Sequence, residues 1–318
     1  MKHKVEYLLV ITVGIVVRRL PIFMLRPLGT ALGALVYAFD RRHRKIAHDN
    51  LQAAFPGRSH RERQHIARGV FSHSGRLVLE LLKLRGMDSE AFLDLLDSEG
   101  EERVREAYKR GQGVLFFSGH FGYWEVSALS QGLCVAPMSL VVRPLDNPML
   151  DQLLLRLRMQ TGNSIIPRKG SVRRIMRELA ANKGVGLLID QHLHGPDAVF
   201  VTFFGRRAAT TSALAAMALR TGAVVVPLFG LPSPGGRYRV IAEHPIEPPV
   251  SDGAQAVQEF TQRCTDVLEM YVRKHPELWF WMHRRWRFDD MSSSTDESIN
   301  LSGRGGTGNV TTDGHAAS

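Results

Sequence analysis

Short apolar runs that alternate with helical segments between residues 113 and 274 constrain the fold of this chain most strongly. Each run is continuous and ends at a polar residue or Pro, which is typical of a strand buried on both faces. The runs predict strands at 114–117, 138–142, 164–167, 185–189 and 223–229, and helices are predicted at 147–160, 171–182 and 211–220. Because strands and helices alternate, we expect an α/β fold with a mostly parallel central sheet flanked by helices.

Three further segments complete the predicted domain. Apolar residues at helical period predict amphipathic helices over 61–84 and 252–274. Residues 238–242 are expected to pair at an edge of the sheet. Ser89 is predicted to cap a short helix that ends near Leu96 and is stopped by Gly100.

The N-terminus carries two apolar stretches, Tyr7–Val17 and Leu28–Phe39. At about 1.5 Å per residue, the first stretch is too short to cross a hydrocarbon core of roughly 30 Å unaided. Basic residues follow it, and no small-residue cleavage site of a signal peptide is present. We therefore expect residues 1–45 to form an uncleaved anchor of membrane-associated helices, tilted through the bilayer or lying in one leaflet. A buried hairpin of core helices is the alternative.

The charge balance predicts an anionic partner. The chain of 318 residues has a net charge of +10, and residues 289–318 hold five acidic residues and one arginine, so residues 1–288 carry +14. Such a body suits a nucleic acid, an acidic protein or a phospholipid surface. The segment 291–318 is rich in Ser, Gly and Thr and is expected to be disordered. Two cysteines cannot form a disulfide framework or a four-cysteine zinc site.

The segment Phe117–Glu125 carries the most informative chemistry, because a buried strand ends there in a glycine turn that contains His120. In an open α/β sheet, ligands bind at the carboxyl ends of the strands. Gly119 and Gly122 would allow the backbone to approach a ligand closely. Glu125, in the first turn of the next helix, could fold back onto His120 and leave its other ring nitrogen as a general base. The alternative is a structural histidine followed by a helix-capping Glu.

Two other clusters are candidates for binding. Asp190, His192 and His194 follow a predicted strand and could ligate the metal of a hydrolase, although Asp190 could equally orient the substrate or the protein. Arg143 and Arg158 could make bidentate contacts with a phosphorylated acceptor. The neighbouring cations are expected to form a solvated basic face: Arg156, Arg168, Lys169, Arg173 and Arg174.

A tryptophan- and arginine-rich segment, Pro276–Phe288, lies near the C-terminus. Its rings could stack on nucleic-acid bases, sit at the lipid headgroup boundary, or seal the core beneath the sheet. The sequence pattern leaves all three interpretations open.

Taken in order, these segments resemble the late acyltransferases of lipid A biosynthesis, of the lauroyl/myristoyl type, within the lysophospholipid acyltransferase superfamily. The resemblance covers about residues 40–288. It is carried by the segments 50–56, 119–125, Arg143-Pro144, Asn147-Pro148, Asp190-Gln191, 203–205, 221–223 with Pro227, and 276–286. Tyr123 departs from the pattern, since we expect Asn there.

The resemblance implies that residues 46–290 are an acyltransferase domain on the cytoplasmic side of the inner membrane. The domain would move a fatty acyl group from acyl carrier protein or coenzyme A to a hydroxyl of an anionic lipid A precursor, without a further cofactor, metal or nucleic acid. His120 and Glu125 take the catalytic positions. Substrate contacts are predicted at Arg143, Asn147, Arg158, Asp190 and Gln191. Three alternatives stay open: a phosphatidylinositol mannoside as the acceptor, a metal-dependent hydrolase, and a non-enzymatic protein that binds membrane or nucleic acid.

Overall fold

The computed structural model of the chain describes residues 1–195 and 197–286, and Met1–Arg285 form one compact unit. The segment 291–318, predicted to be disordered, lies outside the described residues. The helices are α1 (Lys2–Arg19), α2 (Ile22–Phe39), α3 (Arg41–Ala54), α4 (His60–Leu84), α5 (Ser89–Leu93), α6 (Glu101–Lys109), α7 (Trp124–Cys134), α8 (Pro148–Met159), α9 (Val172–Ala180), α10 (Ala213–Thr221) and α11 (Gly253–Lys274).

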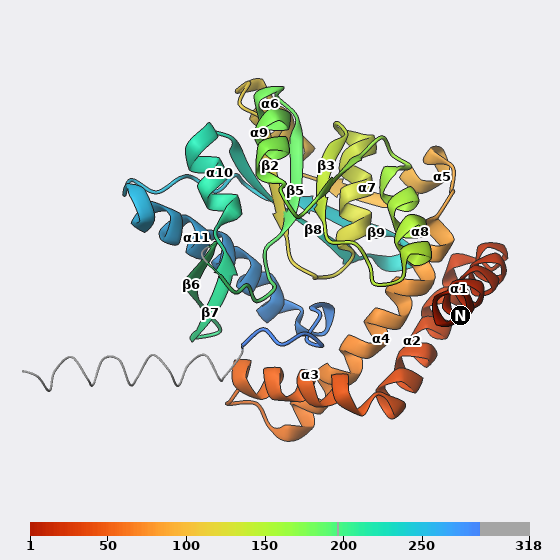
Figure 1. Cartoon of the computed structure of the whole chain (residues 1–318). Coiled ribbons are helices and arrows are strands. Elements are labelled where there is room, and N and C mark those ends of the chain that lie inside the picture. Colours follow the sequence, from red (N-terminus) through yellow and green to blue (C-terminus); the bar gives the residue numbers. More distant parts are fainter. Residues whose placement is uncertain (196, 287–318) are drawn as a thin grey trace, which may run out of the picture. The chain divides into compact units, whose positions relative to one another are not determined.

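A seven-stranded sheet forms the centre of this unit, with the strand order β1-β9-β8-β2-β5-β3-β4 (Figure 1). Its strands are β1 (Leu96–Glu99), β2 (Val114–Ser118), β3 (Met138–Val142), β4 (Ser164–Pro167), β5 (Gly184–Leu188), β8 (Val224–Pro232) and β9 (Tyr238–Ala242). The β8–β9 pair is antiparallel and the other pairs are parallel. The predicted mostly parallel α/β sheet is therefore confirmed.

Strand β2 lies in the middle of the sheet, between β5 and β8. All five of its residues are buried, which explains why its sequence is a continuous apolar run rather than an alternating one. Phe116 and Val114 belong to a core cluster that also includes residues of β8, β9, α7 and α4. The carboxyl end of β2, where His120 follows, is consequently fixed from several sides.

The structure corrects three details of the prediction. Strand β9 is not at the edge, because β1 pairs with it in parallel and takes the edge position. The short helix α5 ends at Leu93, and Gly100 precedes α6 in a left-handed conformation instead of stopping a helix. A two-stranded hairpin, β6 (Ala198–Phe203) and β7 (Arg206–Thr211), was not predicted.

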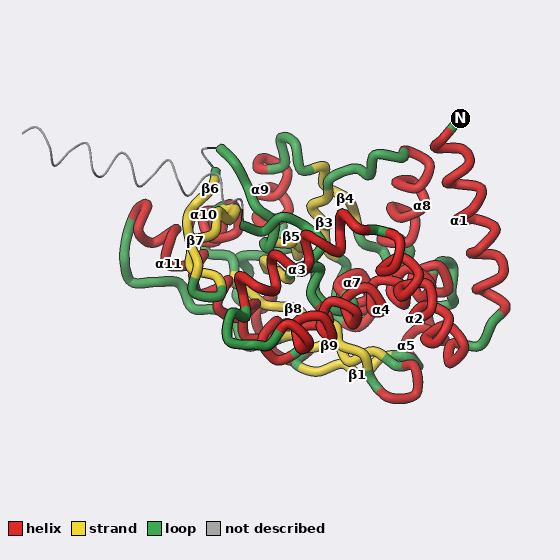
Figure 2. The backbone as a smooth tube through the Cα atoms, turned by 90° about the horizontal axis from the view of Figure 1, so that it is seen from below, coloured by secondary structure: helices red, strands yellow, loops and turns green. Residues whose placement is uncertain are grey.

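The N-terminal helices α1 and α2 pack along α4 rather than standing away from the sheet domain (Figure 2). Among the described residues, α2 is the helix long and apolar enough to cross a membrane by length and composition. Only 17% of that stretch is buried. The outer sides of both helices therefore face away from the protein.

Candidate active site

His120 and Asp190 meet at the carboxyl ends of two neighbouring parallel strands. Strand β2 pairs with β5 up to Ser118 and Leu188, and the amide of Ile189 donates a hydrogen bond to the carbonyl of Ser118 (3.0 Å). His120 and Asp190 each follow two residues after these partners, so the register brings both side chains to one edge of the sheet.

Three donors fix the carboxylate of Asp190. Oδ1 lies 2.8 Å from Nδ1 of His120, while Oδ2 accepts hydrogen bonds from the backbone amide of His120 (2.7 Å) and from Nε1 of Trp279 (2.8 Å). Asp190 is almost completely buried, and the side chain of His120 keeps 23% of its surface exposed. A carboxylate partner assigns the ring proton to Nδ1, which leaves Nε2 with a lone pair.

Burial alone would lower the pKa of His120. The charge of Asp190 and the hydrogen bond to it outweigh burial, the charge of Glu125 adds to them, and the pKa of His120 is raised above 6.5. Burial would likewise raise the pKa of Asp190, but the charge and hydrogen bonds of His120 hold it well below its ordinary range. The aspartate is therefore ionised, and the imidazole is a stronger base than a free histidine.

The glycines of the turn allow close contacts with the protein's own groups. A Cβ on Gly119 would lie 3.1 Å from Oδ2 of Asp190, and one on Gly122, whose φ is +54°, would lie 2.0 Å from the carbonyl oxygen of Gly230. These glycines let the protein's own groups approach the turn. Segment 278–280 also binds it, since Leu278 accepts from the amide of Gly122 (2.8 Å) and Phe280 donates to the carbonyl of His120 (2.9 Å).

The predicted hydrogen bond between Glu125 and His120 is not formed, because Asp190 occupies Nδ1. Glu125 is buried and accepts two hydrogen bonds from Arg158, at Nε (2.9 Å) and Nη2 (2.5 Å), and one from Nε1 of Trp124 (3.1 Å). It still acts on His120 through its charge. Arg158 therefore makes the bidentate contact predicted for it, but with a carboxylate of the protein.

The other predicted substrate contacts are distributed more widely. Nε2 of Gln191 lies 3.5 Å from Nε2 of His120, beside the proposed base. Arg143 is exposed and lies 3.7 Å from Asp146. Asn147 is buried, caps α8 through Oδ1, and donates from Nδ2 to the carbonyl of His3 and to Glu6. The structure thus gives Asn147 a role in attaching α1.

The metal-binding alternative lacks a suitable arrangement in the described residues. Asp190 already gives both oxygens to His120 and Trp279. His192 and His194 pack against each other with ring centroids 4.3 Å apart. Within residues 1–195 and 197–286, no group of three or more His, Cys, Asp or Glu residues is placed to hold a metal ion.

The tryptophans Trp279 and Trp281 are core residues. Both have 0% exposure and their rings pack edge to face, 4.6 Å apart. They are therefore placed neither for base stacking nor for a headgroup boundary. Tyr123 is also buried, and its hydroxyl donates to Glu80 (3.2 Å), so it belongs to the core and not to an acceptor site.

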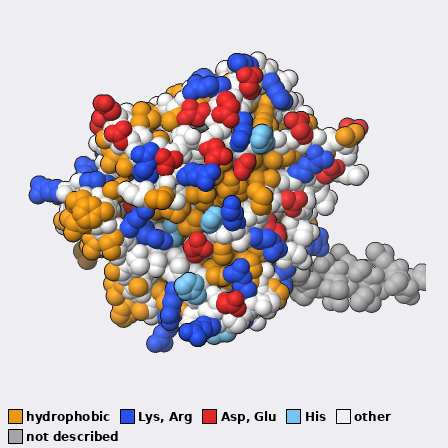
Figure 3. All heavy atoms as spheres, turned by 180° about the vertical axis from the view of Figure 1, so that it is seen from behind, with side chains coloured by type: hydrophobic (Ala, Val, Ile, Leu, Met, Phe, Trp, Pro, Cys, Tyr) orange, Lys and Arg blue, Asp and Glu red, His pale blue; other side chains and the backbone are white. Residues whose placement is uncertain are grey.

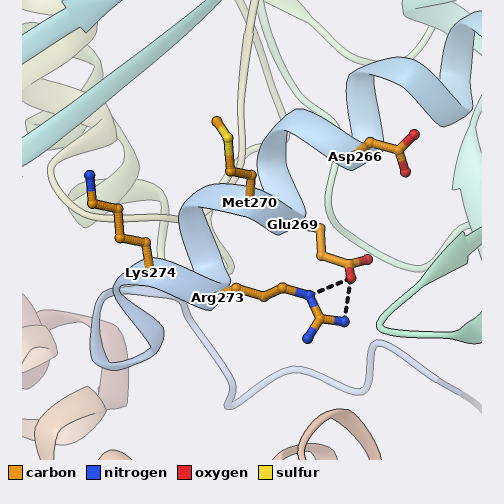
Figure 4. Close-up of a pocket in the computed structure, with 5 residues that line it drawn as sticks. All are labelled: Asp266, Glu269, Met270, Arg273 and Lys274. Atoms are coloured by element: carbon orange, nitrogen blue, oxygen red, sulfur yellow. Dashed lines mark hydrogen bonds and ion pairs between the residues drawn. The ribbon is translucent and has the colours of Figure 1, made fainter.

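An open cavity of about 530 Å³ lies on α11, and none of the residues predicted for the site lines it (Figure 4). Its lining residues are Asp266, Glu269, Met270, Arg273 and Lys274. Glu269 pairs with Arg273 and accepts the amide of Phe204 (2.6 Å), which satisfies its carboxylate within the protein. We therefore assign the chemistry to the edge of the sheet at His120.

Comparison with known proteins defines the class of enzyme. Residues 1–288 match the family described as bacterial lipid A biosynthesis acyltransferase. A lipid A biosynthesis lauroyltransferase of Escherichia coli is 29% identical over 272 residues, which cover 85% of this chain and 87% of that protein. A palmitoleoyltransferase and a myristoyltransferase of lipid A biosynthesis from the same organism are 26% and 24% identical, covering 87% and 80% of this chain and 89% and 79% of theirs.

Among solved structures, the 1-acyl-sn-glycerophosphate acyltransferase PlsC of Thermotoga maritima aligns with a TM-score of 0.37 and 15% identity. The alignment covers 80% of this chain and 96% of that chain. The family match and the sequence relatives define an O-acyltransferase. The chain belongs to the bacterial lipid A biosynthesis acyltransferase family.

Proposed function

We propose that this enzyme transfers a fatty acyl group from an acyl thioester to a hydroxyl of a lipid A precursor, with His120 as the general base. The observation that carries the proposal is the hydrogen bond of Asp190 to Nδ1 of His120, at a partly exposed position after a central strand, in a chain of this family. Nε2, which lies 3.5 Å from the side-chain nitrogen of Gln191, then keeps a lone pair that can accept the proton of an alcohol.

The reaction balances without an acyl-enzyme. The hydroxyl oxygen of the acceptor forms a bond to the thioester carbonyl carbon while its proton moves to Nε2 of His120. The tetrahedral intermediate then expels the thiolate as the C–S bond breaks, and His120 returns the proton to sulfur. Because a thioester is already activated, we propose that neither a metal nor a further cofactor takes part.

Stabilisation of the oxyanion cannot come from three amides of the glycine turn. The amides of His120, Gly122 and Tyr123 donate to Asp190, Leu278 and Gly230 respectively. Arg158 is the better candidate, because it is mostly buried and its cation acts on His120. Its Nε and Nη2 bind Glu125, so we assign Nη1 to the oxyanion or to the substrate. Glu125 would then position Arg158.

The charge of the protein and its exposed apolar surface indicate its substrates and its cellular location. The charge of +14 on residues 1–288 favours an acidic donor such as acyl carrier protein and a phosphorylated glycolipid acceptor. The exposed apolar faces of α1 and α2 favour attachment to a membrane. We propose the inner membrane with the catalytic unit on the cytoplasmic face, where both donors are made.

The test uses the full-length enzyme, purified in detergent, with acyl carrier protein and coenzyme A thioesters as donors. Acceptors are a lipid A precursor and a phosphatidylinositol mannoside, analysed by mass spectrometry. The proposal predicts that the lipid A precursor gains the mass of one acyl group. A gain confined to the mannoside would overturn the acceptor, and release of free fatty acid without transfer would indicate a hydrolase.

A further inference from the structure

The outer surfaces of α1 and α2 carry most of the exposed large hydrophobic residues. Of the 22 large hydrophobic residues that are exposed in the described part of the chain, 13 lie within the first 39 positions. They are Met1, Val5, Leu8, Leu9, Ile15, Val16, Phe23, Met24, Leu28, Leu32, Leu35, Val36 and Phe39. Figure 3 shows hydrophobic side chains gathered on the left, where α1 and α2 lie in this view. A patch of this kind needs an apolar partner.

The inner side of α2 is fixed to α4 by close backbone contact. A Cβ on Gly33 would lie 2.1 Å from the carbonyl oxygen of Phe71, and one on Gly29 would lie 2.5 Å from Cα of Arg76. From the opposite side, a Cβ on Gly75 would lie 2.2 Å from the carbonyl oxygen of Gly29. Helix α4 in turn buries Val70, Leu77 and other residues in the unit. Helix α2 is therefore one layer of the catalytic unit.

A charged side chain attaches α2 a second time. Arg26 donates from Nη1 to the carbonyl of Ser233 (3.0 Å) and from Nη2 to that of Arg237 (3.2 Å), and its Nε lies 3.7 Å from Glu80. Glu80 is buried at 1% exposure and accepts from the hydroxyl of Tyr238 (2.7 Å). A helix crossing the bilayer apart from the unit would take Arg26 into hydrocarbon and remove from buried Glu80 the cation that lies 3.7 Å away.

Helix α1 is attached at both ends. Near its start, Nδ2 of Asn147 donates to the carbonyl of His3 (2.9 Å) and to Oε2 of Glu6 (2.8 Å). At its end, Nζ of Lys83 donates to the carbonyls of Arg18 (2.6 Å) and Leu20 (3.0 Å). The first residues of the chain consequently lie beside α8, on the catalytic unit itself.

We propose that α1 and α2 enter one leaflet side by side with the catalytic unit and do not span the bilayer, so that the N-terminus and the active site lie on the same side. The occupant of the apolar face is an anionic phospholipid leaflet. Exposed cations lie at the end of each helix, namely Arg18 and Arg19 in the last turn of α1 and Arg41, Arg42 and Lys45 just after α2, and they complement anionic headgroups. The inference rests on the membrane attachment in the proposed function and adds its topology.

The test of topology uses single cysteines and a membrane-impermeant maleimide. In a background with Cys134→Ser and Cys264→Ala, Lys2→Cys reports the N-terminus and Lys109→Cys reports the exposed end of α6 on the catalytic unit. In intact spheroplasts and in inverted vesicles, both positions should label from the same side. Labelling of Lys2→Cys and Lys109→Cys from opposite sides would overturn the proposal.

A matched pair of glycine variants tests the contact between α2 and α4. Gly33→Ala should lower the thermal midpoint in detergent by about 2–4 °C or more, because the backbone of Phe71 cannot yield. Gly14→Ala on α1 meets only a leucine methyl at 3.7 Å and should leave the midpoint unchanged or raise it. Equal thermal midpoints for the two variants would contradict the close packing of α2 on α4, which is the reason for excluding a transmembrane α2.

Binding to vesicles distinguishes the leaflet from a second copy of the chain. The wild-type protein should sediment with vesicles that contain anionic phospholipid. A stable dimer that stays in solution with such vesicles would replace the leaflet by a protein partner. Acyl transfer is measured separately in each sample, so a result that contradicts the proposed membrane topology can be distinguished from one that contradicts the proposed reaction.

Discussion

Replacing Asp190 by Asn tests which carboxylate supports the base. The carboxylate of Asp190 accepts from two N–H groups at Oδ2 and from Nδ1 of His120 at Oδ1. The asparagine amide has one accepting oxygen. If that oxygen stays with the two N–H groups, the amide nitrogen faces Nδ1 and must donate to it. The imidazole proton then moves to Nε2, and the lone pair needed for the alcohol is lost.

Two effects of Asp190→Asn should be separable. The loss of a positioned base predicts that kcat falls by about 10²–10⁴-fold. The remaining activity should extend to lower pH, because the charge that raises the pKa of His120 has gone while burial, which lowers it, stays. Neutral His120 is the active form, so the acidic limb of the pH profile should lie above 6.5 in the wild type and move down in the variant.

The matched variant is Glu125→Gln, which removes the other nearby negative charge. Its acidic limb should move down less, because the charge of Glu125 contributes less to the pKa of His120 than Asp190 does. The assay is the initial rate of acyl transfer between pH 5.5 and 8.5 at subsaturating acceptor, so that it reports kcat/KM and the pKa of His120 in the free enzyme. A larger shift for Glu125→Gln than for Asp190→Asn would refute the pairing of His120 with Asp190.

Three other predictions concern the surroundings of the site. Trp279→Phe removes the hydrogen bond to Oδ2 of Asp190 and should lower kcat by about 10–100-fold with little change in KM. The control Trp281→Phe loses only a hydrogen bond to the carbonyl of Pro276 in the same segment and should retain most activity. Equal losses of activity in the two variants would reduce Trp279 to a packing residue. Arg158→Lys cannot make the bidentate contact with Glu125 and should lose about 10-fold or more in kcat. The control Arg156→Lys, on the same helix, should stay within about twofold of the wild type. Full activity of Arg158→Lys would contradict a role for the Arg158 guanidinium held by Glu125. Burial lowers the pKa of His73 to about 4, so protonation of this residue in the unfolded chain destabilises the fold by about 3 kcal/mol as the pH falls from 6.5 to 4. In urea unfolding, the free energy of unfolding of His73→Leu should therefore fall by about this much less over the same pH range. An unchanged pH dependence in the variant would count against a neutral buried His73.

The sheet could be predicted because its strands are buried on both faces. Val114–Ser118 and Met138–Val142 are continuous apolar runs, and each ended where it was predicted to within one residue. Strand β1 carries Asp97, Ser98 and Glu99, so its sequence has no apolar run and its place at the sheet edge could not be recognised. In the hairpin β6–β7, which was also missed, Ala198–Phe203 is mostly apolar, but its partner Arg206–Thr211 has no apolar run that would mark a second strand.

His120 could be identified as a candidate base from its place after a strand, but its partner could not. Glu125 is near in sequence, and Asp190 is 70 residues away. Choosing between them needs the strand order, which puts β5 next to β2 although two other strands intervene in sequence between them. The sequence offered one indication that His120 and Asp190 could meet, namely that each of them follows a buried strand.

The side chains that attach distant segments were the least predictable. Asn147 was recognised as a helix cap, but its second contact, with α1, depends on tertiary packing. Trp279 reaches Asp190 only because segment 278–280 runs beside the glycine turn. Glycines 29, 33 and 75 indicate close helix contact once α2 and α4 are known to be neighbours, and an apolar helix by itself carries no such information.

The most direct test of His120 as the general base is the transfer rate of His120→Ala, measured with an isotopically labelled acyl thioester and the lipid A precursor. Thermal unfolding of the same sample serves as the control for folding. General-base catalysis by His120 predicts a rate lower by about 10²–10⁴-fold at an unfolding midpoint near that of the wild type. A correctly folded His120→Ala enzyme that transfers the acyl group at the wild-type rate would contradict it.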